Sequence, residues 1–281
     1  NVNWGKVLAW LPEVARPKVK KLGFKTKLKW TALILLLYFV LTRVPLWGLG
    51  QNALAQFDYL STILGASFGS LISLGIGPIV TASIILQLLV GSGLLNIDTT
   101  TTEGKMKFQG LQRVMIIAFI LFEGAIYVLM GGLSPSAGLV ASYGYGAAAT
   151  FLIVQLCLGG FMIMMMDEVV SKWGFGSGIS LFIAAGVASQ IFIRAFNPLK
   201  QGAKYSAGAV IQIVQSLRAG EPLVTTIAVV AILATILVFF IAVYAQAMKV
   251  EIPLSFGRVR GYGMRWPLSF MYTSAIPVIL I

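Results

Sequence analysis

Histidine is absent from this sequence of 281 residues, and Cys157 is its single cysteine. One cysteine cannot form an internal disulfide, and without histidine there is no imidazole for a Cys/His metal site or for nucleophilic catalysis. Charged residues are also scarce, because they make up 11% of the chain, against about 25% in soluble domains. The sequence therefore predicts neither a metal centre nor a disulfide-stapled domain nor a histidine-dependent enzyme.

Apolar residues take the place of the missing charges. They form 58% of the chain, and the mean hydropathy is +0.90, so lipid is the expected solvent. Stretches long enough to cross a bilayer core of roughly 30 Å lie near 30–47, 77–95, 111–131, 146–166, 178–196 and 223–248. A seventh begins near Pro267 and is still apolar at Ile281. We expect the sequence to stop inside a seventh span.

The basic residues indicate how the spans are oriented. Most of the 21 Lys and Arg precede the first span or lie in alternate connections, including the one at 249–266. Because cytoplasmic loops carry an excess of Lys and Arg, we expect the N-terminus and 249–266 in the cytoplasm, and 132–145 and 197–222 outside. The four basic residues between 194 and 218 depart from this rule.

Residues 58–76 do not follow the pattern of simple spans. They are apolar and helix-like, but too short to cross, and Gly77-Pro78 separates them from the next apolar helix. Non-helical backbone at membrane depth persists only where protein or an aqueous cavity surrounds it. We predict a helix folded back into a cavity. A kinked single span with a long amphipathic lead-in is the alternative.

Three short patterns resemble functional motifs. The G-x-S-x-G pattern at 65–69 has no histidine to activate its serine, so close helix packing explains it better. The glycine-rich stretch at 174–178 lacks the Gly-Lys-Ser/Thr ending of a phosphate loop, and we interpret it as a flexible cap before a membrane helix. The adjacent acids Asp167 and Glu168 are interpreted as a solvated helix end.

Two features leave alternatives open. Glu123 lies near the middle of the span at 111–131, where an ionised carboxylate in lipid costs at least about 2.5 kcal/mol. It must face other helices or water, either in a structural hydrogen bond or in gating. The connection at 250–267 is basic and glycine-rich, with Arg258, Arg260 and Arg265 at close spacing, and suits anionic lipid or an RNA backbone equally.

Several long segments together resemble the SecY family, the channel-forming (alpha) subunits of the Sec protein translocase, in its archaeal form. They are LGIGPIVTASIILQLLVGSG at 74–93, MDEVVSKWGFGSGISLFIAAGV at 166–187 and AQAMKVEIPLSFGRVRG at 245–261, with further similarity at 24–39 and 272–280. The resemblance runs along the whole chain in the same order.

The resemblance implies an all-α polytopic membrane protein, a helix bundle of inverted repeats with a re-entrant plug helix. Seven of the family's ten spans would be present, the last of them incomplete. The chain would comprise a basic cytoplasmic segment over 1–29, an N-terminal half over 30–196 with the plug at 58–72, and the start of the C-terminal half over 197–281.

The resemblance also implies roles for individual residues. An apolar ring at the pore constriction would be formed by Ile76, Val80, Ile179, Ile183, Ile276 and Ile279. Thr81 and Glu123 would lie at a lateral gate to lipid. The plug would present Leu60, Ile63, Leu64 and Phe68. Arg258, Arg260 and Arg265 would lie in the partner-binding connection at 249–266. Independently of the family, spacings of i, i+4 or i, i+3 put each pair of ring residues on one helix face.

The implied function is a protein-conducting channel of the cell membrane that moves secretory polypeptides across and releases transmembrane segments into lipid. It would need no cofactor and would not be an enzyme. The implied partners are SecE (gamma), a small beta subunit, the ribosome, signal peptides with their nascent chains, and membrane lipids. A secondary transporter would need polar groups around the break at 75–78, which has Gly, Ile, Gly and Pro. An intramembrane enzyme or a scaffold is less consistent with the sequence.

Overall fold

α-Helices make up most of the computed structural model, which describes residues 13–15, 17, 22–52, 66–98, 100–198, 205–254 and 264–269. The elements are α2 (Phe24–Thr42), β1 (Leu49–Asn52), α4 (Gly77–Gly91), α5 (Thr102–Leu129), β2 (Leu133–Pro135), α6 (Ala137–Tyr143), α7 (Tyr145–Trp173), α8 (Gly178–Phe196), α9 (Ala209–Ala219), α10 (Pro222–Ala247), β3 (Lys249–Leu254) and β4 (Met264–Ser269). They fall into two compact units that divide within α8, between Ala188 and Ser189.

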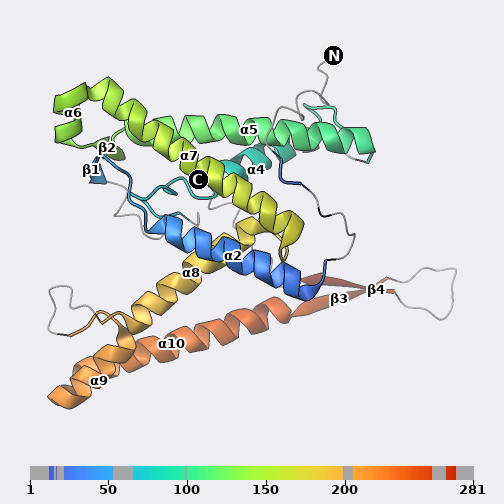
Figure 1. Cartoon of the computed structure of the whole chain (residues 1–281). Helices are drawn as coiled ribbons and strands as arrows, with labels where there is room; N and C mark the ends of the chain where they lie inside the picture. The colour runs from blue at the N-terminus through green and yellow to red at the C-terminus, as the bar shows by residue number, and fades with distance from the viewer. Residues whose placement is uncertain are drawn as a thin grey trace. The chain divides into compact units, whose positions relative to one another are not determined.

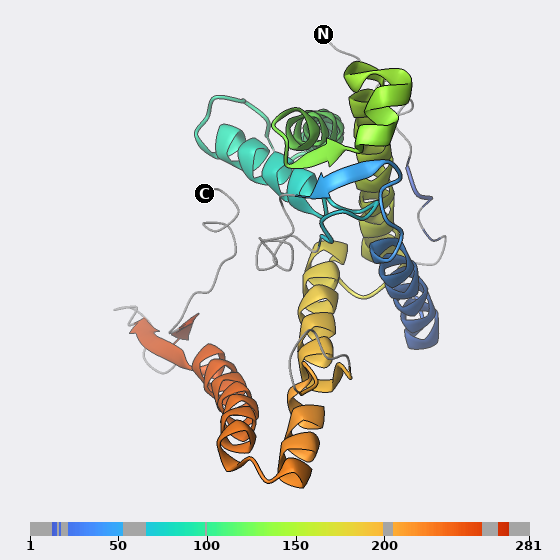
Figure 2. The same cartoon turned by 90° about the vertical axis from the view of Figure 1, so that its left-hand side faces the viewer.

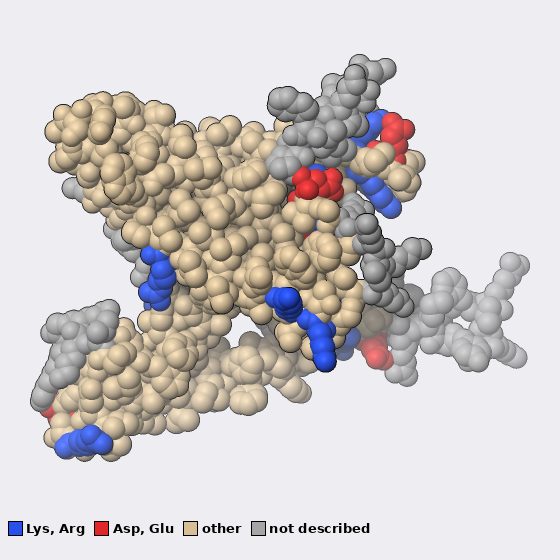
Figure 3. All heavy atoms as spheres, viewed as in Figure 1, with Lys and Arg blue, Asp and Glu red and all other residues tan. Residues whose placement is uncertain are grey.

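Four of the described helices are long and apolar enough to cross a membrane, namely α5, α7, α8 and α10. Helix α2 has 19 residues with three lysines in its first two turns, and α4 has 15 residues. On the face seen in Figure 3, charged side chains gather near helix ends and leave long uncharged surfaces between them. The chain is a multi-pass membrane protein.

The first six predicted spans each correspond to a helix, but several helices extend beyond the apolar run. Helix α5 begins at Thr102 rather than near 111, and α7 continues to Trp173 rather than ending near 166. Thr101 caps the early start of α5, because its Oγ1 accepts a hydrogen bond from Gly104 N at 3.1 Å. Hydropathy measures the lipid-facing part of a helix, so it misses turns that continue into water.

The N-terminal unit is organised around α7, which lies between α5 and α2 (Figure 1). Helix α4 packs against α5. Fully buried Leu152, Leu156 and Ile163 of α7 belong to one apolar cluster that also takes in side chains of α2, α4 and α5. Gly159 of α7 permits a close approach here, since a Cβ at this position would lie 1.8 Å from the carbonyl oxygen of Leu71.

A short antiparallel ribbon joins two connections of this unit. Strand β1 pairs with β2, with Leu49 opposite Pro135 and Asn52 opposite Leu133 (Figure 2). Strand β1 follows α2 and β2 follows α5. The predicted topology places the connection after α2 and the connection after α5 on the external side of the membrane. The two connections must then lie next to one another on the same side, and the pairing of β1 with β2 agrees with this requirement.

The predicted helix at 58–76 is wrong over its described part. Residues 66–76 form a succession of turns, and the remainder lies outside the described residues. Two glycines have positive φ, Gly69 at 92° and Gly75 at 56°, which other residues adopt rarely. Serine side chains compete for the backbone as well, since Ser73 Oγ donates to Ser70 O and accepts from Gly69 N.

The C-terminal unit contains α9, α10 and a β-hairpin. Helix α9 packs against α10, where Ser216 Oγ and Thr225 Oγ1 share a hydrogen bond of 2.8 Å. The basic connection at 249–266 includes β3 and the start of β4, which pair in antiparallel register. The seventh span was predicted to start near Pro267, which instead lies in β4. Residues 270–281 lie outside the described residues.

Candidate functional site

The turns at 71–76 lead directly into α4, and the first predicted ring residues lie at this junction. Ile76 is the N-cap residue of α4 and is completely buried. Val80, one turn later, is half-buried and packs against the same apolar cluster. Pro78 lies in the first turn of the helix, where its missing N–H breaks no hydrogen bond.

Helix α8 supplies two further ring residues. Ile179 and Ile183 are half-buried and pack against the same cluster as Ile76 and Val80. Four of the six predicted ring residues therefore border one apolar region of the N-terminal unit. The other two, Ile276 and Ile279, lie outside the described residues.

Helices α4 and α5 carry the two predicted gate residues, Thr81 and Glu123, both half-buried. The helices are linked by a hydrogen bond of 2.8 Å from Gln112 Nε2 to Ser83 Oγ. Our sequence reasoning missed this pair. Gln112 lies three helical turns before Glu123, and Ser83 lies just after Thr81. The recurrence of polar residues along these two apolar helices could have predicted a polar contact between them.

Phe68 connects the predicted plug segment to α5. Its ring meets that of Tyr127 edge-on, with centroids 6.3 Å apart, and Tyr127 lies one helical turn after Glu123. The backbone carbonyl oxygen of Phe68 accepts a hydrogen bond of 3.0 Å from Asn52 Nδ2 of β1. The other predicted plug residues, Leu60, Ile63 and Leu64, lie outside the described residues.

The N-terminal segment is bound near the C-terminal end of α7 and to Arg113 in the first half of α5. We call Glu13, Arg113, Glu168 and Lys172 the N-terminal ion cluster. Glu168 Oε1 lies 2.5 Å from an Arg113 nitrogen and 2.9 Å from Lys172 Nζ, and Glu13 Oε1 lies 2.8 Å from Lys172 Nζ and 3.3 Å from Arg113. Hydrogen bonds from Arg113 and Lys172 lower the pKa of Glu13 to about 2.

Backbone contacts complete this attachment. Val14 N donates to Glu168 Oε2 at 3.2 Å, and Trp173 Nε1 donates to Ala15 O at 2.9 Å. The interpretation of Asp167 and Glu168 as a solvated helix end is thus wrong, because the Glu168 side chain is only 14% exposed. Its hydrogen-bond partner Val14 lies 154 residues away in sequence and could not be found from local pattern.

Asp167 faces the start of α8. Its Oδ1 accepts a hydrogen bond of 3.0 Å from Ile179 N, and Gly178 lies directly against this carboxylate. The connection before α8 is held at its other end by Thr31 of α2, whose Oγ1 accepts from Phe175 N at 3.1 Å. The glycine-rich stretch at 174–178, interpreted above as flexible, is therefore attached to two helices.

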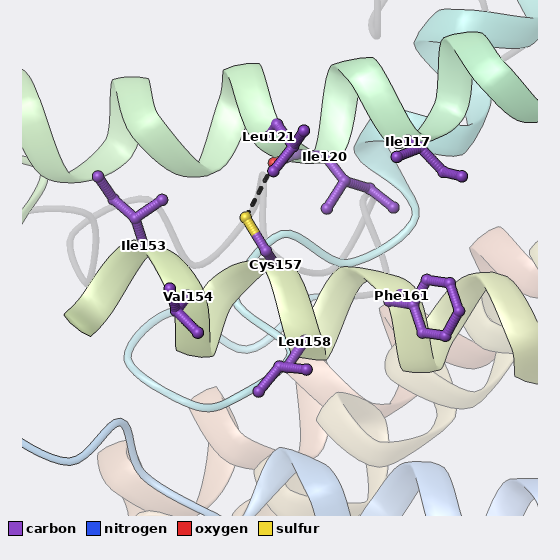
Figure 4. A pocket seen from close by; sticks show the side chains of 8 residues that line it. All are labelled: Ile117, Ile120, Leu121, Ile153, Val154, Cys157, Leu158 and Phe161. Atoms are coloured by element: carbon purple, nitrogen blue, oxygen red, sulfur yellow. Dashed lines mark hydrogen bonds between the residues drawn. The ribbon is translucent and has the colours of Figure 1, made fainter. Parts of the chain in front are cut away.

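An apolar groove of about 310 Å³ lies between α5 and α7 (Figure 4). It is lined by Ile117, Ile120, Leu121, Ile153, Val154, Cys157, Leu158 and Phe161. The Cys157 thiol donates to the backbone oxygen of Ile120 at 3.8 Å. The groove offers no pair of polar side chains that could perform acid–base chemistry, and the described residues contain no cluster of potential metal ligands.

The basic connection of the C-terminal unit is only partly described. Arg265 lies in β4 opposite Pro253 of β3. Arg258 and Arg260 lie between the two strands, outside the described residues. The strands nevertheless fix where this segment starts and ends.

Comparison with known proteins identifies the family. The SecY family model matches residues 70–281, and the model of the plug domain of Sec61p matches 36–69. The chain belongs to the SecY family. The protein translocase subunit SecY of Methanothermobacter thermautotrophicus is 47% identical over 276 residues, covering 96% of this chain and 59% of that protein. The SecY subunit of Pyrococcus horikoshii is 43% identical, with coverage of 96% and 60%.

Solved structures of SecY relatives have the same fold. The structure of a protein-conducting channel matches with a TM-score of 0.74 and 39% identity, covering 98% of this chain and 59% of that one. Sec61 in the canine ribosome–channel complex from the endoplasmic reticulum matches with a TM-score of 0.73 and 39% identity, with the same coverage. The expected fold class, a helical membrane bundle with a plug, is confirmed. The chain spans about 59% of the length of these SecY relatives.

Proposed function

We propose that the complete protein is a protein-conducting channel of the cell membrane, through which secretory polypeptides cross and from which transmembrane segments enter lipid. Membership of the SecY family supports this proposal, as do relatives described as protein translocase subunits and a protein-conducting channel. No energy-supplying step is assigned to this chain. Polypeptide would be driven through it by a partner.

One observation carries the proposal. The non-helical backbone of residues 66–76 lies among spanning helices, close to Gly159 of α7 and hydrogen-bonded to the connection after α2 through Leu71 N and Val44 O. Backbone of this kind at membrane depth is stable where protein or a water-filled cavity surrounds it. A solid bundle of spans would not need it, whereas a pore closed by a re-entrant segment would.

The chemistry of the apolar ring suits a channel for unrelated polypeptides. Ile76, Val80, Ile179 and Ile183 offer no hydrogen bonds, so a passing chain of any sequence meets little specific attraction. A narrow neck of aliphatic side chains also excludes water and ions by dewetting. In this proposal Ile276 and Ile279 complete the ring. A transporter of one solute would need polar groups at the same place.

Lateral release is assigned to α4 and α5. Thr81 and Glu123 are half-buried on these helices, where they could meet polar groups of the family's remaining spans when the gate is closed. A signal peptide or transmembrane segment would leave between α4 and the seventh span. Residues 58–72 would form the plug, with Leu60, Ile63, Leu64 and Phe68 facing the pore.

The proposed partners follow from the relatives. One solved relative is Sec61 in a ribosome–channel complex, and we assign ribosome binding to 249–266 with Arg258, Arg260 and Arg265. SecE and a small beta subunit would complete the translocon, with nascent chains as substrates and membrane lipids around it. The N-terminal segment would be cytoplasmic. In this arrangement 30–196 forms the N-terminal half, and 197–281 begins the C-terminal half.

Resting ion conductance tests the channel. In the complete channel complex, Ile76→Ser and Ile183→Ser should each raise resting conductance in planar bilayers several-fold, because a hydroxyl stabilises water in the neck. Polypeptide selectivity should change little. Leu158→Ser is the matched control, since Leu158 of α7 is 56% exposed and lines the outer groove. Equal resting conductance in the wild type and all three variants would contradict the ring assignment.

A further inference from the structure

The position of the apolar ring depends on how α8 is held at its first turn. The first four N–H groups of a helix have no partner within the helix. In α8, the carboxylate of Asp167 accepts from one of these groups, because Ile179 N donates to its Oδ1 at 3.0 Å. Asp167 belongs to α7, so the bond ties the start of one spanning helix to the end of another.

The contact between Asp167 and α8 is too close to tolerate a side chain at the joint. A Cβ at Gly178 would lie 2.6 Å from Asp167 Oδ1 and 2.7 Å from Asp167 Cα. The Asp167 residue and the backbone at the start of α8 are therefore in close contact.

Two further contacts restrict α8 independently of Asp167. Thr31 Oγ1 holds Phe175 N at 3.1 Å, and a Cβ at Gly174 would lie 2.8 Å from the same oxygen. One turn into α8, the buried ring of Phe182 stacks on Tyr38 of α2, with centroids 5.1 Å apart and planes inclined by 21°. The start of α8 is thus attached to α2 as well as to α7.

We propose that Asp167, supported by Thr31, is a positioning residue for the apolar ring. The residue whose N–H it binds is Ile179, a predicted ring residue, and Ile183 follows one helical turn later. Because an α-helix rises only 5.4 Å per turn, the bond fixes the height and rotation of both side chains. This inference rests on the proposed channel function for its purpose, but the placement of α8 can be measured without it.

The test uses thiol reactivity in the complete channel complex. With Cys157→Ser as background, Ile183→Cys provides a single thiol whose reaction rate with a water-soluble maleimide reports the local position of α8. Adding Asp167→Ala should change this rate by about fivefold or more, comparable to the effect of one lost helix cap on an equilibrium. Asp167→Asn, whose amide oxygen still accepts the backbone N–H bond, should restore the rate to within twofold.

Thr101→Ala is the matched control. Thr101 caps α5 through Gly104 N at 3.1 Å, so its loss lowers helix stability without touching α8, and the rate should stay within twofold. Thr31→Ala provides a second test that leaves Asp167 intact. It should shift the rate in the same direction as Asp167→Ala.

The outcomes separate this inference from the proposed function. An unchanged rate in both Asp167→Ala and Thr31→Ala would overturn the positioning role, as would an equal change in Thr101→Ala. Resting conductance of Ile183→Ser, measured in the same preparation, tests the ring alone. If that conductance is unchanged while the thiol rates respond to Asp167, the positioning stands and the ring assignment fails.

Discussion

Glu13 shows how one carboxylate can attach a terminal segment to the end of a helix bundle. Hydrogen bonds from Arg113 and Lys172 lower its pKa to about 2 from the ordinary 4.5. Because the docked form binds the proton more weakly than the released form, docking gains stability above pH 4.5 and loses it as the pH falls towards 2. Glu13 is 40% exposed, so the gain is at most about 1 kcal/mol.

We expect Glu13→Gln to lower the hydrogen-exchange protection of residues 13–15 at pH 6 by up to about fivefold, corresponding to that free energy. At pH 3 the wild-type segment should already have lost part of its protection, and the difference between the proteins should narrow. Glu103→Gln is the control, because Glu103 pairs with Lys107 on an exposed helix face and is not part of the N-terminal ion cluster. Equal protection at both pH values in all three proteins would exclude the carboxylate as the attachment.

The partners of Asp167 and Glu168 could not be predicted from the sequence. Two adjacent acids at the end of an apolar run are typical of a solvated helix terminus, yet one caps α8 and the other holds the N-terminal segment. Their partners are Ile179 N, which is local, and Val14 N, which lies 154 residues away. A buried carboxylate needs partners, but the sequence led us to expect both acids in solvent. It could not predict which partners the fold would bring.

At the scale of elements, apolar periodicity and length were sufficient to locate six helices, because bilayer thickness imposes about 20 apolar residues on a span. Four of these six helices are long and apolar enough to cross a membrane. The turns at 66–76 were not predictable in the same way. Their apolar residues fit a helix, while Gly69, Gly75 and the serine hydrogen bonds favour turns. The hairpin of β3 and β4 was missed because polar, glycine-rich sequence resembles an unstructured loop until the two strands pair.

The proposed binding of a ribosome by residues 249–266 can be tested by charge reversal. Strands β3 and β4 pair on either side of the segment that contains both arginines, which itself lies outside the described residues. Arg258→Glu and Arg260→Glu, each in the complete channel complex, should weaken ribosome binding and lower the salt dependence of the binding constant, since about one phosphate contact is lost in each. Lys105→Glu, another exposed cation predicted on the same side, is the control and should have little effect. Unchanged binding at low and moderate salt would favour anchoring to anionic lipid instead.

At the scale of the molecule, the N-terminal unit has two chemically different ends. One end carries the β1–β2 ribbon, and the other carries the N-terminal ion cluster. Helix α5 has 28 residues, about 42 Å at 1.5 Å per residue, which exceeds the bilayer core. Arg113, its residue in the cluster, lies 16 residues before the end of the helix at Leu129, about 24 Å. The cation-rich end is predicted to be cytoplasmic, since cytoplasmic flanks of spanning helices are enriched in Lys and Arg.

Thiol labelling in intact cells tests this orientation for the whole chain. With Cys157→Ser as background, Ser134→Cys places a thiol on β2, opposite Gln51 of the ribbon, and should react with a membrane-impermeant maleimide added outside. Lys105→Cys, at an exposed position in the first turn of α5, is predicted on the other side and should react only after the membrane is disrupted. Lys105 lies on α5 and Ser134 lies on β2, which follows it. If α5 crosses the bilayer, only one of the two introduced thiols can react with the reagent added outside. Labelling of Lys105→Cys in intact cells with protection of Ser134→Cys would reverse the topology, and with it the assignment of 249–266 to a cytoplasmic partner.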